Sequence, residues 1–292
     1  MCYLCDEYGD PEFGDGVWYL NPKNYARNMY TLRLPDGATR EARGAETGSE
    51  IQERARGIAD LVTAMEKGDQ AEYEKIKQQM NESRRRSGTE GQVIPLEEAD
   101  KVLELCSPIG LIACVCRKGA RAIDERNELE YTCMGMGVGM LKWERWPERY
   151  KGGVKFVTVE EAKEWNHRMD KRGFVHLLML AGAPYIGGFC QCDYPDCAAI
   201  RRVVDFGGAG AFGAIGTLKS HHVAQVDYDE CNGCGICVQR CQFGALKFEV
   251  TSQKANIDQF KCYGCGLCQT GCPRGAIKLL ERKSLPALVE VW

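Results

Sequence analysis

The chain has 292 residues, of which 27% are charged, and its formal net charge is −3 at pH 7. A charge so close to balance gives no reason to expect binding to nucleic acid. The sequence contains no run of 18 apolar residues, so no membrane span is predicted. The first residues lack the charged and apolar regions of a secretory signal, so we expect a cytoplasmic protein. In that reducing compartment its 17 cysteines are not expected to form disulfides, and their number favours metal binding by many of them.

The N-terminal segment, residues 1–92, opens with a pair of cysteines. Cys2 and Cys5 are separated by two residues, which is the spacing of half a metal site. If this pair binds metal, the remaining ligands must come from elsewhere in the chain. The alternative is a pair of free thiols on a mobile end.

Two helices are predicted in the rest of this segment. Apolar residues recur at helical spacing from Ile51 to Met65, and Asp69 is suited to cap a second helix that runs to residue 86. The charged hairpin ends in three consecutive arginines, 84 to 86, which form either a solvated face or a docking site for an acidic partner. Residues 87–92 are predicted to be a linker.

A cysteine-rich α/β domain is expected over residues 93–221. It begins with a helix from residue 96 to residue 105, in which Pro95 takes the first helical position. A buried strand over residues 109–117 then delivers Cys114 and Cys116 at its end, and alternate side chains of a strand share one face. Cys133 follows in a glycine-rich stretch that we expect to be a flexible loop.

The middle of this domain is predicted to contain a strand, a helix and a second strand. Residues 154–157 form the first strand, and Thr158 with Glu161 makes a capping box that opens a helix to residue 172. Gly173 supplies the helix stop, and residues 174–180 form the second strand. A glycine-rich loop and three cysteines come next, followed by a helix to residue 202.

Two further patterns in this domain are weaker signals. His176 lies in the middle of an apolar strand, where a histidine is more often a core residue than a ligand or a catalytic group. Gly208, Gly210 and Gly213 match a dinucleotide fingerprint. The sequence leaves no space for the helix, second strand and acidic residue which that fold requires, so we expect a packing loop there.

Residues 231–272 contain a doubled cysteine motif. Each run has the form C-x2-C-x2-C-x3-C, and every cysteine of the second run lies 31 residues after its counterpart. This spacing is typical of [4Fe–4S] clusters, in which one loop supplies three thiolates and the fourth comes from the other run. We therefore assign one cluster to Cys231, Cys234, Cys237 and Cys272, and a second cluster to Cys262, Cys265, Cys268 and Cys241.

The motif resembles that of the bacterial-type two-cluster ferredoxins, over residues 222–282. The resemblance implies a small pseudo-symmetric domain in which two clusters lie close enough to exchange electrons. Short strands are predicted at residues 223–226, 246–250, 255–257 and 277–280. In one departure from the family, Cys241 is followed by Gln242, a polar group that would change the potential of a nearby cluster.

The charge of the ferredoxin-like region suggests how it is used. Residues 222–283 carry six acidic and eight basic side chains. Diffusible ferredoxins of this type are usually strongly acidic, so this balance favours a relay embedded in a larger protein. The apolar tail, residues 284–292, either folds back on the domain or packs into a partner.

Six upstream cysteines are candidates for a further centre. Their order, together with the helix at 159–172 and the ferredoxin motif, resembles a family of iron–sulfur proteins of anaerobic bacteria over residues 96–282, although that family has a denser cluster at residues 190–197. The resemblance implies at least one further [4Fe–4S] cluster. The preferred ligands are Cys190, Cys192 and Cys197, with one of Cys114, Cys116 or Cys133. Zinc and buried free thiols are the alternatives.

The predicted fold class is α+β: an N-terminal helical segment, a cysteine-rich α/β domain and a C-terminal two-cluster ferredoxin domain. The predicted function is electron transfer, as the relay subunit or dedicated donor of a low-potential oxidoreductase complex in an anaerobe, with redox proteins as partners. One alternative is an enzyme whose cluster near Cys190 and Cys197 has an iron open to substrate or bound by His176. The other is a redox sensor that uses the charged hairpin as its output face.

Overall fold

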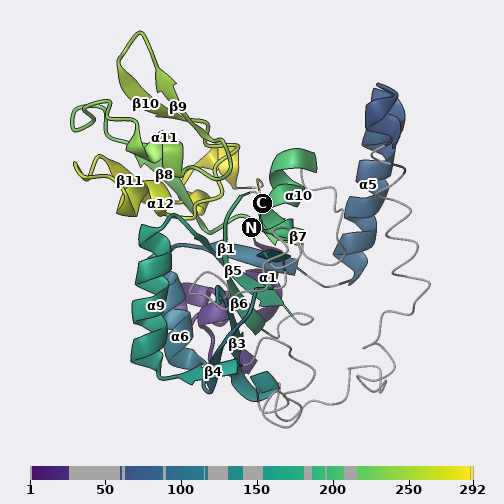
Figure 1. The fold of residues 1–292 in the computed structure, drawn as a ribbon, viewed down its shortest axis with the longest axis vertical. Coiled ribbons are helices and arrows are strands. Elements are labelled where there is room, and N and C mark those ends of the chain that lie inside the picture. Colours follow the sequence, from purple (N-terminus) through teal and green to yellow (C-terminus); the bar gives the residue numbers. More distant parts are fainter. Residues whose placement is uncertain are drawn as a thin grey trace.

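The computed structural model describes residues 2–25, 60, 63–87, 90–114, 116–117, 131–140, 154–180, 186–194, 196–206, 216–289 and 291. Its largest element is a seven-stranded sheet with the strand order β4-β2-β3-β6-β5-β1-β7 (Figure 1). All neighbours in this sheet are antiparallel except β1 and β7, which are parallel. The strands are β1 (Glu90–Ile94), β2 (Ile109–Ile112), β3 (Cys133–Met136), β4 (Val154–Val157), β5 (Val175–Leu180), β6 (Ile186–Cys192) and β7 (Gly216–Leu218).

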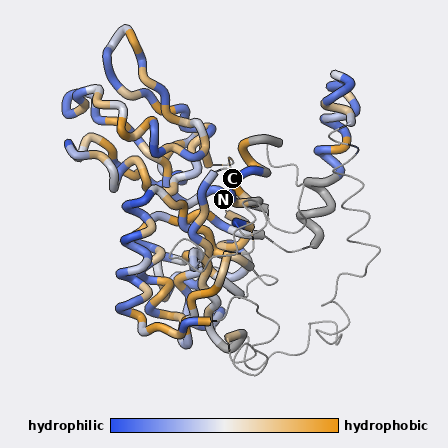
Figure 2. The backbone as a smooth tube through the Cα atoms, in the orientation of Figure 1, coloured by the Kyte–Doolittle hydropathy of each residue, from blue (hydrophilic) through white to orange (hydrophobic). Residues whose placement is uncertain are grey.

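One face of the sheet is covered by helices and by the N-terminal segment. Helices α6 (Leu96–Leu105) and α9 (Val159–Lys171) pack there together with α1 (Tyr3–Tyr8) and the short 3-10 helices η1 (Gly14–Gly16) and η2 (Trp18–Leu20). In Figure 2 both α6 and α9 alternate between hydrophilic and hydrophobic residues, as expected of helices with one face on a core. Trp18 and Tyr19 are fully buried in this layer, so the N-terminal segment is part of the main core.

The opposite face of the sheet carries a second apolar cluster. It joins Val93, Val175 and Leu177 of the sheet to Ile200 of α10 (Ala198–Phe206) and to residues of the C-terminal unit. The two faces follow from the alternation of side chains along each strand. The sheet therefore separates a helical layer from a layer that contains cysteines and the C-terminal unit.

Several predicted element boundaries agree with the structure. Helix α9 begins with the predicted capping box, in which Thr158 Oγ1 accepts from the Glu161 amide at 3.1 Å and Glu161 Oε2 accepts from the Thr158 amide at 2.8 Å. Helix α5 (Gln70–Ser87) begins after Asp69, whose carboxylate accepts the Glu72 amide at 3.1 Å. Figure 1 shows α5 standing away from the sheet. Most of the preceding predicted helix and the glycine loop at 208–213 lie outside the described residues.

Three predictions for this part of the chain are wrong. The expected linker at residues 87–92 overlaps strand β1, whose buried Gln92 accepts a 2.7 Å hydrogen bond from the Trp18 indole. Cys133 lies in strand β3 rather than in a flexible loop. Pro95 is the residue before helix α6 and has an extended backbone, so it is the N-cap rather than the first helical residue.

The C-terminal unit has the predicted pairs of short strands. Strand β8 (His222–Val226) pairs antiparallel with β11 (Ile277–Glu281), and β9 (Leu246–Glu249) pairs with β10 (Lys254–Ile257). Two short helices, α11 (Ile236–Arg240) and α12 (Leu267–Thr270), follow the two cysteine loops. The C-terminal tail folds back through η6 (Arg282–Ser284) and η7 (Pro286–Leu288) and buries Leu288 in the core of this unit. Among the described residues, no helix has the length and apolar character needed to cross a membrane.

Candidate metal centres

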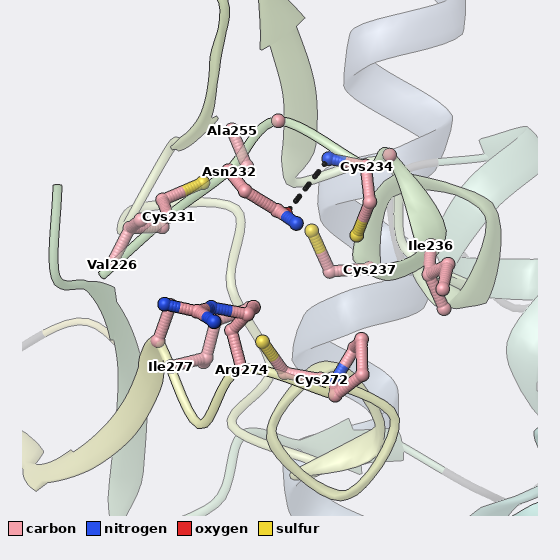
Figure 3. A pocket seen from close by; sticks show the side chains of 14 residues that line it. Val226, Cys231, Asn232, Cys234, Ile236, Cys237, Ala255, Cys272, Arg274 and Ile277 are labelled. Carbon is pink, nitrogen blue, oxygen red and sulfur yellow. Dashed lines mark hydrogen bonds between the residues drawn. The ribbon is translucent and has the colours of Figure 1, made fainter. Parts of the chain in front are cut away.

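The first of the two four-cysteine groups in the C-terminal unit surrounds a single pocket. We call it the outer site; it consists of Cys231, Cys234, Cys237 and Cys272. Figure 3 shows these four thiols around one space, with Asn232 and Arg274 beside them. Cys234 is exposed to solvent, whereas Cys237 is buried at the start of α11.

The second group surrounds a similar pocket on the side of the unit that faces the sheet. We call it the inner site; it consists of Cys241, Cys262, Cys265 and Cys268. Backbone amides point at two of its sulfurs: Ala224 and Gly264 donate to Cys262 Sγ at 3.5 and 3.4 Å, and Ala245 donates to Cys241 Sγ at 3.3 Å. The structure thus brings together the same two sets of cysteines that the spacing predicts.

The loops of both sites have the shape that a cubane requires. Gly233 and Gly264, at equivalent positions of the repeat, have φ angles of 72° and 66°. A Cβ atom at Gly233 would collide with the carbonyl oxygen of Gln253, and one at Gly264 would collide with that of His222. Each loop therefore needs glycine to turn tightly against a neighbouring backbone segment while three thiols converge. Four converging thiols, with amides aimed at sulfur in the inner site, are a ligand set suited to a [4Fe–4S] cluster.

The two sites differ in the residues that cover them. Asn232 and Arg274 line the outer pocket and are exposed, whereas their counterparts 31 residues away in the repeat, Tyr263 and Phe243, line the inner pocket. Phe243 and Tyr263 are stacked, with ring centroids 4.2 Å apart. Burial raises the pKa of the Cys268 thiol to about 12, because desolvation penalises the charged thiolate.

Two side chains next to Cys241 attach the inner site to the rest of the protein. The Arg240 guanidinium donates to the carbonyl oxygens of Asp170 and Lys171 at the end of α9, at 2.7 and 3.0 Å. Gln242 donates to the Gly173 carbonyl at 2.9 Å and accepts from the Tyr194 amide at 2.8 Å. Gln242, which departs from the ferredoxin pattern, therefore joins the two halves of the molecule.

The six upstream cysteines lie in one group on the sheet face that the C-terminal unit covers. Neighbouring thiols shift one another's pKa in the closed order Cys114, Cys133, Cys190, Cys192, Cys197, Cys116 and back to Cys114, and we call this group the thiol ring. The Cys133 and Cys190 sulfurs are 3.5 Å apart across the β3–β6 pair. Strand β2 ends at Ile112, so Cys116 reaches the ring from a helical turn and not from the predicted strand.

A buried arginine holds two loops of the ring together. Arg117 forms ion pairs with Asp193 and with Asp196, the latter at 3.1 Å, and donates to Thr132 Oγ1 at 2.5 Å. Its backbone amide donates to Cys114 Sγ at 3.4 Å. These contacts fix the segment after β2 against the segment between Cys192 and Cys197, and they place a positive charge beside the thiols.

His176 is not placed to bind metal at the ring. In the β5–β6 ladder His176 faces Gln191, whereas Leu177 faces Cys190, so the histidine side chain lies on the opposite side of the sheet from the thiols. It stacks on Phe189 at a centroid distance of 5.8 Å, and its Nε2 lies 3.6 Å from Asp170 Oδ1. The enzyme alternative in which His176 binds an iron of this centre is therefore not supported.

The N-terminal cysteine pair meets a residue far along the chain. Cys2 is buried, and Cys5 Sγ lies 3.1 Å from Nε2 of His221. The three ligand atoms of Cys2, Cys5 and His221 all lie within 4.8 Å of one another. Nothing in the sequence indicates that His221 is a ligand, because 216 residues separate it from Cys5 and no motif relates the two.

Comparison with known proteins places the C-terminal unit in a family. Residues 230–276 match the family model of the 4Fe-4S dicluster domain, and this range contains every cysteine of the outer and inner sites. No curated protein matches the chain. The chain therefore contains a ferredoxin-type iron–sulfur domain that carries [4Fe–4S] clusters and serves electron transfer.

Proposed function

We propose that this protein is an electron relay with three [4Fe–4S] clusters, working as a subunit or dedicated donor of a low-potential oxidoreductase complex in an anaerobe. The outer and inner sites hold one cluster each. Cys190, Cys192 and Cys197, with one of Cys114, Cys116 or Cys133, hold the third. Each bound cluster supplies a one-electron carrier.

The observation that carries this proposal is the position of the inner site beside the thiol ring. Cys265 and Leu267 belong to the same apolar cluster as Cys190, Cys192 and Cys197. The chain therefore places its thiols in the order outer site, inner site, ring. Apolar side chains fill the space between the last two groups and exclude water from it.

The surface around the outer site supports an exchange with a redox protein. Cys234 is exposed, and so are the apolar side chains of Ile236, Phe248 and Val250 on the same unit, at 39%, 40% and 71% of their full areas. Exposed apolar residues around a redox centre favour a transient protein contact. In this proposal the partner docks at the outer site and the ring lies at the far end of the relay.

Metal analysis of the anaerobically purified chain tests the proposal. We expect about twelve irons and twelve sulfides per chain, because each cubane contains four of each. Cys192→Ala should lose about four irons, whereas Cys106→Ala, which removes a buried thiol outside the ring, should lose none. About eight irons would contradict the third cluster, and zinc that is lost in Cys192→Ala would make the ring a zinc site.

A further inference from the structure

The N-terminal cysteine pair and His221 form a group of ligand atoms separate from the three sulfur sites. Cys2 and Cys5 come from the start of α1, and His221 comes from the connection between β7 and β8. The three ligand atoms lie within 4.8 Å of one another, and Cys2 is only 4% exposed. A sulfur, a sulfur and an imidazole nitrogen thus converge between two distant parts of the chain.

The ring of His221 is held by a chain of hydrogen bonds on its far side. Tyr19 Oη donates to Glu98 Oε2 at 2.5 Å and lies 3.0 Å from Nδ1 of His221. Because the tyrosine proton is committed to Glu98, Tyr19 can only accept from His221, so Nδ1 carries the imidazole proton. Nε2 then presents its lone pair toward Cys5. A histidine whose other nitrogen is anchored in this way is the usual arrangement at a metal.

The sulfur of Cys2 also has a polar neighbour with a defined orientation. Gln92 is fully buried, and its Oε1 accepts from the Trp18 indole at 2.7 Å. Its amide nitrogen therefore points the other way, where it donates to the Lys219 carbonyl at 3.0 Å and lies 4.0 Å from Cys2 Sγ. A donor aimed at the sulfur favours the thiolate that a metal requires.

We propose that Cys2, Cys5 and His221 bind one Zn²⁺ ion, with water as the fourth ligand. Zinc takes sulfur at about 2.3 Å and nitrogen at about 2.0–2.1 Å in a tetrahedron, which puts the ligand atoms roughly 3.5–3.8 Å apart. The three ligand atoms, all within 4.8 Å of one another, are close enough to share one ion. A cubane binds each thiolate at a different iron and holds its ligands further apart.

The charges of the site suit a divalent ion in a buried place. Each thiol releases its proton to solvent when the metal binds, so two thiolates balance the two positive charges of zinc. The zinc site is then neutral, so no unpaired charge is buried next to Tyr19 and Gln92 and the desolvation cost of such a charge is avoided. The ion would also link the start of α1 to the segment that leads into the ferredoxin unit, independently of the electron relay.

Zinc content and zinc X-ray absorption of the full chain, purified anaerobically, test this site. We expect an absorption spectrum with two sulfurs at about 2.3 Å and one imidazole nitrogen at about 2.0–2.1 Å. Cys5→Ala and His221→Ala should each lose about one zinc per chain and keep their iron. The controls are Cys106→Ala and His167→Ala, which change a buried thiol and an exposed imidazole outside the site and should keep both metals.

Three results would overturn the proposal. The first is a wild-type chain without zinc, in which the two thiols react with a thiol reagent. The second is a loss of iron in Cys5→Ala or His221→Ala, which would make these residues cluster ligands. The third is a zinc spectrum with sulfur ligands only. If the variants fail to fold, the wild-type spectrum alone decides. The iron count tests the relay separately, so failure of one proposal is distinguishable from failure of the other.

Discussion

The outer and inner sites are built from one repeated motif, but they lie in different surroundings. Three cysteines of the inner site are buried, whereas the outer site exposes Cys234 and half-buries Cys231 and Cys272. Asn232 and Arg274 flank the outer thiols where the stacked pair of Tyr263 and Phe243 covers the inner ones. The repeat thus sets the arrangement of the sulfurs, and the residues that flank the cysteines determine whether each site is exposed to solvent or covered by aromatic rings.

The two cysteine runs also differ at the positions that attach the inner site to the rest of the protein. The counterpart of Arg240 in the repeat is Gly271, where a Cβ atom would collide with the Arg240 side chain. The counterpart of Gln242 is Pro273, which has no such side-chain bonds. The two cysteine runs therefore differ in complementary ways. The first run supplies Arg240 and Gln242 to the contact with the rest of the protein, and Gly271 of the second run leaves space for the Arg240 side chain.

The largest expected difference between the sites comes from removing one thiol from each. Cys234 and Cys265 are counterparts in the repeat, so Cys234→Ala and Cys265→Ala are matched variants. Each should lose about four irons per chain. Cys265→Ala should slow the reduction of the ring centre by dithionite more than Cys234→Ala does, measured by freeze-quench EPR, because Cys265 adjoins the ring. Equal slowing in both variants would contradict the prediction that the inner site, and not the outer site, passes electrons directly to the ring.

A smaller effect is expected from the contacts of Arg240. Arg240→Ala leaves two carbonyl oxygens at the end of α9 without their donor, and we expect the ferredoxin unit to lose about 2 kcal/mol of stability. Urea denaturation followed by loss of iron–sulfur absorbance measures this change. The control is Arg274→Ala, whose ion pair with Glu230 is exposed and should contribute little. Similar losses in the two variants would mean that the interface is not held by Arg240.

The smallest effect should come from the covering residues. Phe243→Arg removes the stacked pair and gives the inner site the residue type that Arg274 supplies at the outer site. The added positive charge favours the reduced cluster, which is the more negative state. We expect the potential of the inner cluster to rise by on the order of 60 mV, a tenfold change in a one-electron equilibrium constant. Arg274→Phe should lower the potential of the outer cluster. EPR-monitored redox titration measures both shifts, and Phe243→Leu, which stays apolar, should move neither.

Local signals in the sequence predicted much of the fold around the sites. The capping box of Thr158 and Glu161 fixed the start of α9 because its side chains bond within one helical turn. The doubled spacing predicted both four-thiol groups because three of the four ligands in each come from one short loop. These features depend on residues close together in the chain, where sequence patterns are informative.

The errors arose where distant packing gives a residue its role. Gly135 looked like part of a loop, but it lies in strand β3, and a Cβ atom there would collide with the Met140 sulfur that packs over it. Gln92 looked like part of a polar linker, but Trp18 and the Lys219 carbonyl satisfy its buried amide. The closed order of the thiol ring likewise depends on pairing between strands, which the spacing of six cysteines does not reveal.

The shared apolar cluster between Cys265 and the thiol ring has a kinetic consequence. In the proposed relay, electrons that pass between these two places move within one molecule, so the rate of that step should not depend on protein concentration and should respond little to salt. In the same proposal, electron delivery at the exposed Cys234 is a collision between two proteins, and its rate should vary with protein concentration and with salt. At low partner concentration the collision therefore limits the flow, and at saturating concentration the internal step does.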